Sequence, residues 1–122
     1  MKKLIIDLDN TICHTAGSDY AASEPVAEIV NRMIMYKKEG FIIVINTSRN
    51  MRTYDGDLEK INAYTLPTII KWLDRHNIPY DEIIVGKPWC GLDGFYVDDR
   101  AIRPSEFLKY EYADLIDLIE KE

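Results

Sequence analysis

Short apolar segments that alternate with longer amphipathic segments constrain the fold of this chain most strongly. Four runs are rich in β-branched and aromatic residues and have the length of buried strands: residues 4–6, 41–45, 83–85 and 95–97. Segments with apolar residues at helical spacing follow the first, second and fourth runs. The order strand, helix, strand, helix, strand, strand, helix predicts an α/β fold with a mostly parallel sheet and helices on both of its faces.

Capping and breaking residues predict where the helices begin and end. Helices are expected from Ser23-Glu24-Pro25 to Gly40, from Thr65 to Asn77, and from Pro104 to the C-terminal end. Pro suits a first helical turn, and Gly suits a left-handed cap. The segments 12–24 and 50–64 have no clear period and are expected to be loops.

Composition limits the class of protein. A chain of 122 residues, 47% hydrophobic and 30% charged, fits one globular domain spanning residues 1–122. Its net charge of −6, with no basic cluster, argues against nucleic-acid binding. No apolar stretch is long enough to span a membrane. The two cysteines, Cys13 and Cys90, are too few for a disulfide scaffold, so a cytoplasmic protein is expected.

Two carboxylates, Asp7 and Asp9, follow the first apolar run within the sequence DLDNT. Residues i and i+2 of an extended strand lie on the same side, so both carboxylates are expected at the carboxyl end of that strand. Ligands of open α/β sheets bind there. Because two close carboxylates repel each other, the pair indicates a metal site, an acid/base pair, or both.

Each of the other predicted strands also ends in a charged or hydroxyl-bearing residue. Thr47 follows the second run, Lys87 the third, and Asp98-Asp99 the fourth. The ends of parallel strands meet at one edge of a sheet, which would then carry carboxylates, a hydroxyl group and an ammonium group. Phosphoryl transfer needs this combination, because its catalysis depends mainly on positioning and charge neutralisation.

These motifs resemble, in order, the four signature motifs of the haloacid dehalogenase superfamily of phosphotransferases. Asp7-Leu8-Asp9-Asn10-Thr11 resembles the first motif, Thr47 the second, Lys87 the third and Asp98-Asp99 the fourth. The resemblance spans residues 4–99. It implies a three-layer α/β/α Rossmann-like core and a phosphatase, since dehalogenases of the superfamily lack an acid at the position of Asp9.

The resemblance also implies a role for each catalytic residue. Asp7 would attack the phosphorus and form an aspartyl-phosphate. Asp9 would protonate the leaving oxygen and later take a proton from water. Thr47 would donate a hydrogen bond to a phosphoryl oxygen, and Lys87 would neutralise charge on the phosphoryl group and on Asp7.

A magnesium ion is the cofactor that the resemblance implies. Asp7, Asp98, Asp99 and the backbone carbonyl of Asp9 would hold Mg²⁺, with the Asp9 side chain turned away from the metal. The substrate-binding residues would be Thr47 (with Ser48 as the alternative hydroxyl donor), Arg49 and Lys87.

The segments between the motifs are too short to hold the cap domain that many relatives carry. An open site without a cap would either take a large substrate or be closed by neighbouring subunits. Capless relatives use subunit contacts, so a homo-oligomer (a tetramer or a dimer) is expected. Residues 46–60 and 83–103 also resemble small phosphatases of bacterial capsular polysaccharide biosynthesis. That likeness implies a small phosphorylated metabolite, such as a sugar phosphate, as the substrate.

Two other functions fit parts of the pattern. Receiver-type signalling domains combine an acidic pair, an acceptor Asp, a hydroxyl and a Lys on a similar sheet, but their acceptor Asp ends a strand in the middle of the chain. Here Asp55 and Asp57 flank a glycine in a predicted turn instead. A non-catalytic protein of the same fold is the second alternative, although all four motifs are intact.

Overall fold

A computed structural model describes residues 1–15 and 20–122. The chain forms two compact units, residues 1–89 and residues 90–122. Each unit is described by itself.

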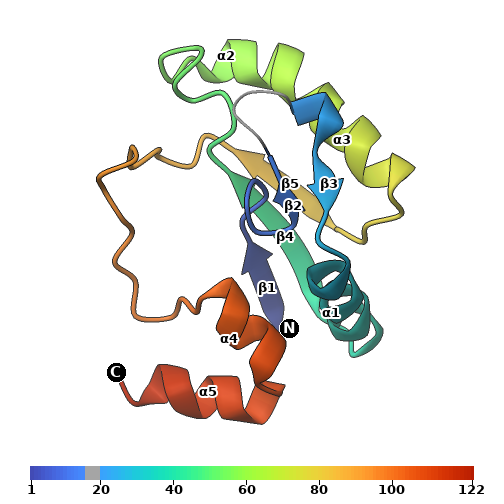
Figure 1. Ribbon diagram of the computed structural model, residues 1–122, viewed down its shortest axis with the longest axis vertical. Helices are drawn as coiled ribbons and strands as arrows, with labels where there is room; N and C mark the ends of the chain where they lie inside the picture. The colour runs from blue at the N-terminus through green and yellow to red at the C-terminus, as the bar shows by residue number, and fades with distance from the viewer. Residues whose placement is uncertain (16–19) are drawn as a thin grey trace. The chain divides into compact units, whose positions relative to one another are not determined.

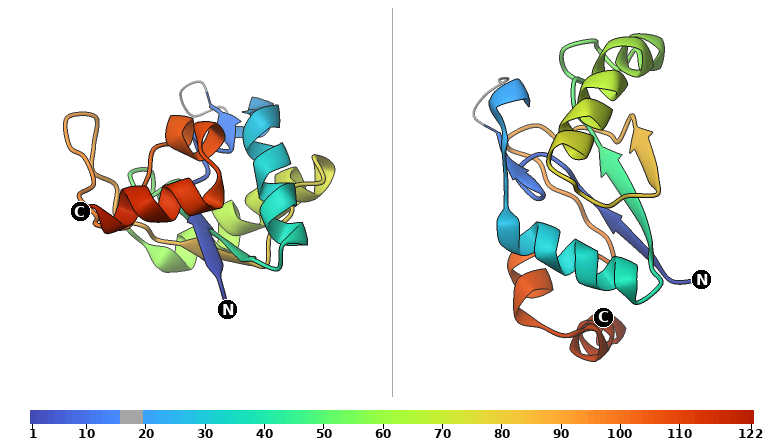
Figure 2. Two further views of the ribbon diagram at one scale, coloured as in Figure 1. Left: turned by 90° about the horizontal axis from the view of Figure 1, so that it is seen from below. Right: turned by 90° about the vertical axis from the view of Figure 1, so that its right-hand side faces the viewer.

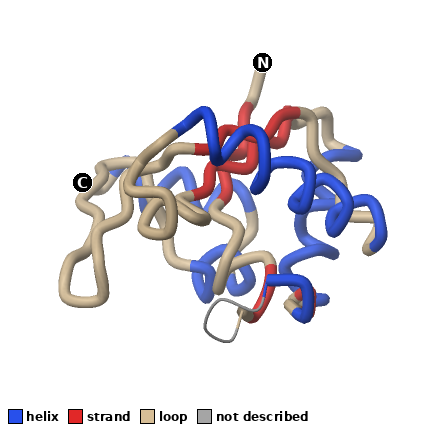
Figure 3. Tube along the Cα trace, turned by 90° about the horizontal axis from the view of Figure 1, so that it is seen from above, coloured by secondary structure: helices blue, strands red, loops and turns tan. Residues whose placement is uncertain are grey.

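A three-stranded parallel sheet lies at the centre of the first unit (Figures 1 and 2). β4 (Ile42–Thr47) lies between β1 (Lys3–Ile6) and β5 (Glu82–Val85). Ile6 pairs with Ile45, and Thr47 pairs with Val85. Because all three strands run in the same direction, their carboxyl ends meet at one edge of the sheet, which we call the rim. In Figure 3 the strands of this sheet form the main cluster of red segments.

Two helices contribute buried apolar side chains to the core of this unit. α1 (Ala27–Lys38) buries Ile29 and Met33, and α3 (Leu66–Arg75) buries Ile69 and Leu73. These side chains recur at helical spacing, as the sequence predicts. The expected left-handed residue after α1 is confirmed, since Gly40 has a φ of 92°.

The predicted loop 12–24 holds regular structure that its sequence does not indicate. β2 (Cys13–His14) pairs antiparallel with β3 (Glu24–Pro25), and η1 (Tyr20–Ala22) is a short 3₁₀ turn. The rest of that loop, residues 16–19, lies outside the described residues. The prediction that α1 begins at Pro25 is wrong, because Pro25 pairs with Cys13 and Val26 is the N-cap.

The prediction of a loop over residues 50–64 is wrong in its second half. α2 (Leu58–Lys60) and the π-helical turn η2 (Ile61–Thr65) run directly into α3. The side chain of Asp57 caps this start by accepting a hydrogen bond from the Lys60 N–H (3.3 Å). Ile61 and Thr65 are buried, so tertiary packing stabilises a segment whose own sequence has only a weak helical period.

The second unit contains two helices, α4 (Pro104–Lys109) and α5 (Tyr112–Glu120), with Phe107 and Leu115 buried. The predicted strand 95–97 is wrong for this chain, since these residues belong to no helix or strand. Figure 1 draws the segment between β5 and α4 as a loop. Strand composition favours a strand only where a neighbour accepts its hydrogen bonds, and residues 90–122 contain no other strand.

The α/β fold with a parallel sheet is confirmed, and no cap domain interrupts the described residues. Within the same residues, no helix combines the length and the apolar character needed to cross a membrane.

Candidate functional site

Asp7 follows the last residue of β1 and reaches the rim with its carboxylate partly exposed. The side chain is 34% exposed, and its Oδ1 lies 3.6 Å from the Lys87 Nζ. The Thr11 hydroxyl donates a hydrogen bond to its Oδ2 (3.1 Å). The next residue, Leu8, is fully buried in the core and so fixes the backbone beside Asp7. The carboxylate is therefore accessible to a ligand and lies close to an ammonium group.

Asp9 is held by many more contacts than Asp7. Arg49 donates two hydrogen bonds to it, from Nε to Oδ2 (3.0 Å) and from Nη2 to Oδ1 (2.8 Å). The Thr15 hydroxyl donates a third, to Oδ1 (2.7 Å), and the Cys13 thiol lies 3.7 Å from the same oxygen. A two-point arginine–carboxylate pair defines both the position and the plane of the carboxylate.

Arg49 is buried, and its guanidinium is directed at Asp9. Its side chain is only 1% exposed, and the guanidinium carbon lies 4.4 Å from the centre of the Tyr20 ring. Its Nη1 has no hydrogen-bond partner among the described residues. The sequence predicts Arg49 as a substrate-binding residue. In the structure its visible partners are a carboxylate of the same chain and an aromatic ring.

Thr47 and Ser48, the two predicted hydroxyl donors, differ in exposure. Thr47 ends β4, is 1% exposed, and accepts a hydrogen bond from the Arg49 backbone N–H (3.1 Å) through its side-chain oxygen. Ser48 is half-buried. The Thr47 hydroxyl therefore shapes the turn that carries Arg49, and its own hydrogen remains available as a donor.

Lys87 follows β5, and its backbone is hydrogen-bonded to the end of β4. Its backbone N–H donates to the Thr47 carbonyl (3.1 Å). Gly86 precedes it with a φ of 87°, and a Cβ atom there would lie 2.6 Å from the Leu58 side chain. The backbone conformation therefore favours glycine at this position, and any larger residue would also displace the Leu58 side chain. The turn brings the Lys87 ammonium group toward Asp7.

Asp98 and Asp99 belong to the second unit, where both are exposed. Asp98 Oδ1 accepts a hydrogen bond from the Arg100 N–H (2.8 Å). Within the described residues of either unit, no group of three His, Cys, Asp or Glu side chains is arranged to hold a metal ion. The first unit thus brings together Asp7, Asp9, Thr47, Arg49 and Lys87 of the predicted site.

Burial changes the acidity of two side chains beside Asp9. It raises the pKa of Tyr20, and the negative charge of Asp9 adds to this effect, while Arg49 opposes it. Burial also raises the pKa of the Cys13 thiol, with a hydrogen bond to Thr15 acting in the opposite direction. Both groups are therefore neutral at pH 7.

Sequence reasoning missed the residues that support Asp7 and Asp9. Thr11, Thr15, Tyr20 and Ser23 were not predicted at the site. The Thr15 and Ser23 hydroxyls lie 2.8 Å apart, and the Ser23 carbonyl accepts a hydrogen bond from the Trp72 indole (3.0 Å). Thr11 lies inside the first motif, so its position could have indicated a role at the site. The other three residues lie in a segment without periodicity, which gives no such indication.

Comparison with known proteins finds one solved structure with a near-identical fold and two solved structures that are distantly similar. No protein-family model and no curated protein matches the chain. Two solved structures of a Pnkp1/Rnl/Hen1 complex, one described as an RNA repair complex, are similar at 22% and 23% identity, with TM-scores of 0.54 and 0.52. The match covers 89% and 88% of this chain but only 34% and 32% of those chains, so it shows a shared fold alone.

The crystal structure of a structural genomics target from Vibrio cholerae is much more similar. Its sequence is 55% identical, the match covers 99% of this chain and 98% of that chain, and the TM-score is 0.96. Identity at this level over almost the whole length of both chains reflects common ancestry. The chain therefore belongs to the same protein family as this Vibrio cholerae protein.

Proposed function

We propose that the protein is a Mg²⁺-dependent phosphatase that hydrolyses a small phosphomonoester through an aspartyl-phosphate intermediate. The observation that carries the proposal is the partly exposed Asp7 carboxylate, 3.6 Å from the Lys87 ammonium group and two residues from a carboxylate held by Arg49. A nucleophile needs access, a neighbouring positive charge and a nearby acid, and Asp7 has all three.

In the first step, a carboxylate oxygen of Asp7 attacks the phosphorus and forms a P–O bond. The bond from phosphorus to the leaving oxygen breaks, and Asp9, which gives up one of its present hydrogen bonds when it carries a proton, passes that proton to the leaving oxygen. Lys87 balances negative charge on the phosphoryl oxygens, and Thr11 orients the Asp7 carboxylate through its hydrogen bond to Oδ2. A donor from Thr47 or Ser48 would bind a further phosphoryl oxygen.

In the second step, water attacks the phosphorus of the aspartyl-phosphate. Asp9, now ionised, takes a proton from that water, and the bond between phosphorus and the Asp7 oxygen breaks. Phosphate leaves, the Asp7 carboxylate is restored, and Asp9 is again protonated. Arg49 and Thr15 hold Asp9 in one orientation, so that one carboxyl group can serve both proton transfers.

The residues of the site suit Mg²⁺ chemically. Asp7 would supply a carboxylate oxygen and Asp9 its backbone carbonyl, because the Asp9 carboxylate is occupied by Arg49. The resemblance to the fourth motif assigns the further carboxylate oxygens to Asp98 and Asp99. Mg²⁺ prefers such oxygen ligands and usually keeps several waters. When bound, the ion would neutralise charge on the transferring phosphoryl group.

The substrate we propose is a small phosphorylated metabolite, such as a sugar phosphate. No cap domain interrupts the described residues, so for a small substrate neighbouring subunits would have to exclude water from the site. A homo-oligomer therefore belongs to the proposal.

Hydrolysis of p-nitrophenyl phosphate and of a panel of sugar phosphates, with Mg²⁺ and with excess EDTA, tests the proposal. We expect turnover that depends on Mg²⁺, and an acid-quenched phosphoenzyme that hydroxylamine cleaves, as it cleaves acyl phosphates. A stable phosphoenzyme without turnover would instead support a receiver-type domain. No hydrolysis of any ester in the panel would overturn the proposal.

A further inference from the structure

The short β2–β3 ladder of the first unit brings two linked hydroxyl groups to Asp9. In this antiparallel ladder His14 pairs with Glu24, so the next pair in the same register is Thr15 with Ser23. Residues that lie opposite each other on one face are close enough for Thr–Ser hydrogen bonds. The hydroxyl oxygens of Thr15 and Ser23 lie 2.8 Å apart, so the two groups are hydrogen-bonded.

Thr15 directs its hydroxyl group at the carboxylate of Asp9. It donates a hydrogen bond to Asp9 Oδ1 (2.7 Å), and its backbone N–H donates to the side-chain oxygen of Asn10 (3.2 Å). A hydroxyl group has one hydrogen, so a Thr15 that donates to Asp9 must accept its second hydrogen bond from Ser23. The hydrogen bonds therefore run in one order, from Ser23 to Thr15 to Asp9.

The core of the first unit fixes Ser23 in turn. Its side chain is buried, and its carbonyl oxygen accepts a hydrogen bond from the indole N–H of Trp72 in α3 (3.0 Å). Trp72 is itself buried. A row of contacts thus connects a core helix, through Ser23 and Thr15, to the carboxylate that we propose as the acid and the base. Support of this kind restricts a side chain to one direction.

We propose that Ser23 is a positioning residue for Asp9 that acts through the Thr15 hydroxyl group, and that this support suits the site to phosphate esters of alcohols. Arg49 defines the plane of the carboxylate, and Thr15 adds a contact from a different segment. Alkoxides are poor leaving groups, so their esters need a well-placed proton donor, whereas p-nitrophenolate leaves with little help. The inference rests on the proposed phosphatase activity.

The ratio of two rates tests the role of Thr15. Each variant is assayed, in one preparation, with p-nitrophenyl phosphate and with the sugar phosphate that the wild type hydrolyses fastest. Partial unfolding lowers both rates equally and leaves their ratio unchanged. We expect Thr15→Val to lower kcat for the sugar phosphate about 10- to 100-fold more than kcat for p-nitrophenyl phosphate, with little change in KM. Thr15→Ser keeps the hydroxyl group and should recover most of this loss.

Ser23→Ala tests whether Ser23 acts through Thr15. It should lower the same ratio by about threefold to tenfold, because Thr15 keeps its bond to Asp9 but loses its own support. The double variant of Thr15→Val with Ser23→Ala should have the ratio of Thr15→Val alone. Thr68→Val removes an exposed hydroxyl group from α3 and is the matched control, with no expected change in the ratio.

Urea denaturation without Mg²⁺ gives a second measurement that does not depend on activity. Because the two hydroxyl groups bond to each other, the stability losses of Thr15→Val and Ser23→Ala should be less than additive in the double variant. Additive losses would contradict the link between Ser23 and Thr15 and overturn the inference.

The rates separate this inference from the proposed function. In an active enzyme, an unchanged ratio in Thr15→Val, or a change confined to KM, would overturn the inference and leave the phosphatase proposal intact. Turnover of p-nitrophenyl phosphate without turnover of any sugar phosphate would also overturn it, because the site would then not favour esters of alcohols. If the wild type hydrolyses neither kind of ester, the proposed function fails, and the inference fails with it.

Discussion

The two carboxylates that follow β1 are held in opposite ways. Among the described residues, Asp7 accepts a side-chain hydrogen bond from Thr11 and lies 3.6 Å from Lys87, with its side chain 34% exposed. Asp9 accepts two hydrogen bonds from Arg49 and one from Thr15, and its side chain is 21% exposed. The two aspartates, two positions apart, thus differ in restraint: few contacts hold the Asp7 side chain, whereas several contacts fix the Asp9 side chain.

This difference suits the two roles that we propose. A nucleophile must reach a substrate, and its own contacts have to leave room for one. A proton donor must face the leaving oxygen from a fixed direction, so contacts that restrict it improve catalysis. The positive charge near Asp7 comes from a flexible lysine, whereas the charge at Asp9 comes from a planar, buried guanidinium group.

Asp7→Asn should have the largest effect. The amide cannot act as the nucleophile, so we expect kcat for p-nitrophenyl phosphate to fall by at least about 10³-fold. The free energy of unfolding should change little, because the side chain is partly exposed and makes few contacts. Asp117→Asn, at an exposed position of α5, is the control. Activity of Asp7→Asn within tenfold of the wild type would exclude Asp7 as the nucleophile.

Arg49→Gln should act through Asp9 and therefore depend on the leaving group. We expect kcat to fall by about 10²-fold for alkyl phosphates, which need a proton donor, and far less for p-nitrophenyl phosphate. Arg49→Lys should be only partly active, because lysine cannot form the two-point pair. An equal rise in KM for both substrates, with kcat unchanged, would show that Arg49 binds the phosphoryl group directly.

The matched control for Arg49 is Arg52→Gln, an exposed arginine of the same segment. It should leave both substrates unaffected. Loss of Asp9 itself, in Asp9→Asn, should reproduce the leaving-group dependence of Arg49→Gln, and the double variant should be no worse than Asp9→Asn, since the two residues act as a pair.

Thr47→Val separates support of the turn from phosphoryl binding. The buried N–H of Arg49 loses its acceptor, so the free energy of unfolding should fall by about 1–2 kcal/mol, as measured by urea denaturation. Ser48→Ala, at the half-buried neighbour, should be close to neutral for stability. The variant with the larger rise in KM identifies the residue that binds the phosphoryl oxygen. Equal stability of the two variants would contradict the structural role of Thr47.

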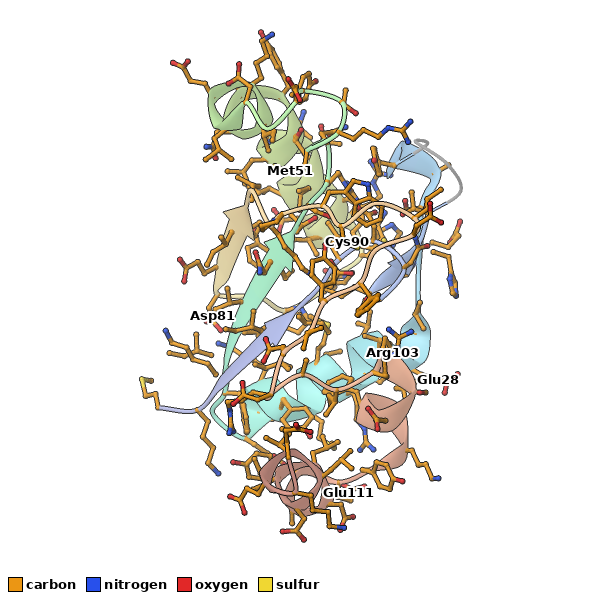
Figure 4. The ribbon with its side chains drawn as sticks, turned by 90° about the vertical axis from the view of Figure 1, so that its left-hand side faces the viewer. Glu28, Met51, Asp81, Cys90, Arg103 and Glu111 are labelled. Atoms are coloured by element: carbon orange, nitrogen blue, oxygen red, sulfur yellow. The ribbon has the colours of Figure 1, made fainter. Side chains whose placement is uncertain are left out.

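Asp81→Asn should have the smallest effect and shows how a carboxylate away from the rim behaves. Hydrogen bonds from Lys37 and then from the Ile43 N–H lower the pKa of Asp81, which lies at the start of β5 (Figure 4). A lowered pKa stabilises the fold above the unfolded pKa, and this contribution disappears as the pH falls through the folded pKa. We expect about 0.5–1 kcal/mol lost at neutral pH, and a smaller difference at acidic pH.

Urea denaturation at both pH values measures the effect of Asp81→Asn, and kcat should not change. A loss of stability that is equal at neutral and acidic pH would show that the ionised carboxylate is not responsible.

Local patterns in the sequence were enough to predict where the site residues lie on the sheet. Apolar runs that end abruptly in polar residues predicted β1, β4 and β5, and parallel strands necessarily bring their carboxyl ends together. The proximity of Asp7 and Lys87 follows from this rule, although they are 80 positions apart in the sequence. The same rule placed Thr47 beside them.

Two features depended on contacts that local patterns do not encode. Arg49 was predicted to bind substrate, but its contact with Asp9 joins residues 40 positions apart through a specific side-chain orientation. The segment 95–97 has the composition of a strand, yet it forms none, because a strand exists only with a neighbour that accepts its hydrogen bonds.

By itself, the sequence determined the α/β class, the helix faces and the order of the reactive groups, because periodicity and strand ends are local properties of the chain. Only the tertiary structure decided which carboxylate is held and which is open, since that depends on the direction of Arg49, Thr15 and Lys87 in space. The two aspartates of DLDNT are alike in the sequence, and only packing makes them different.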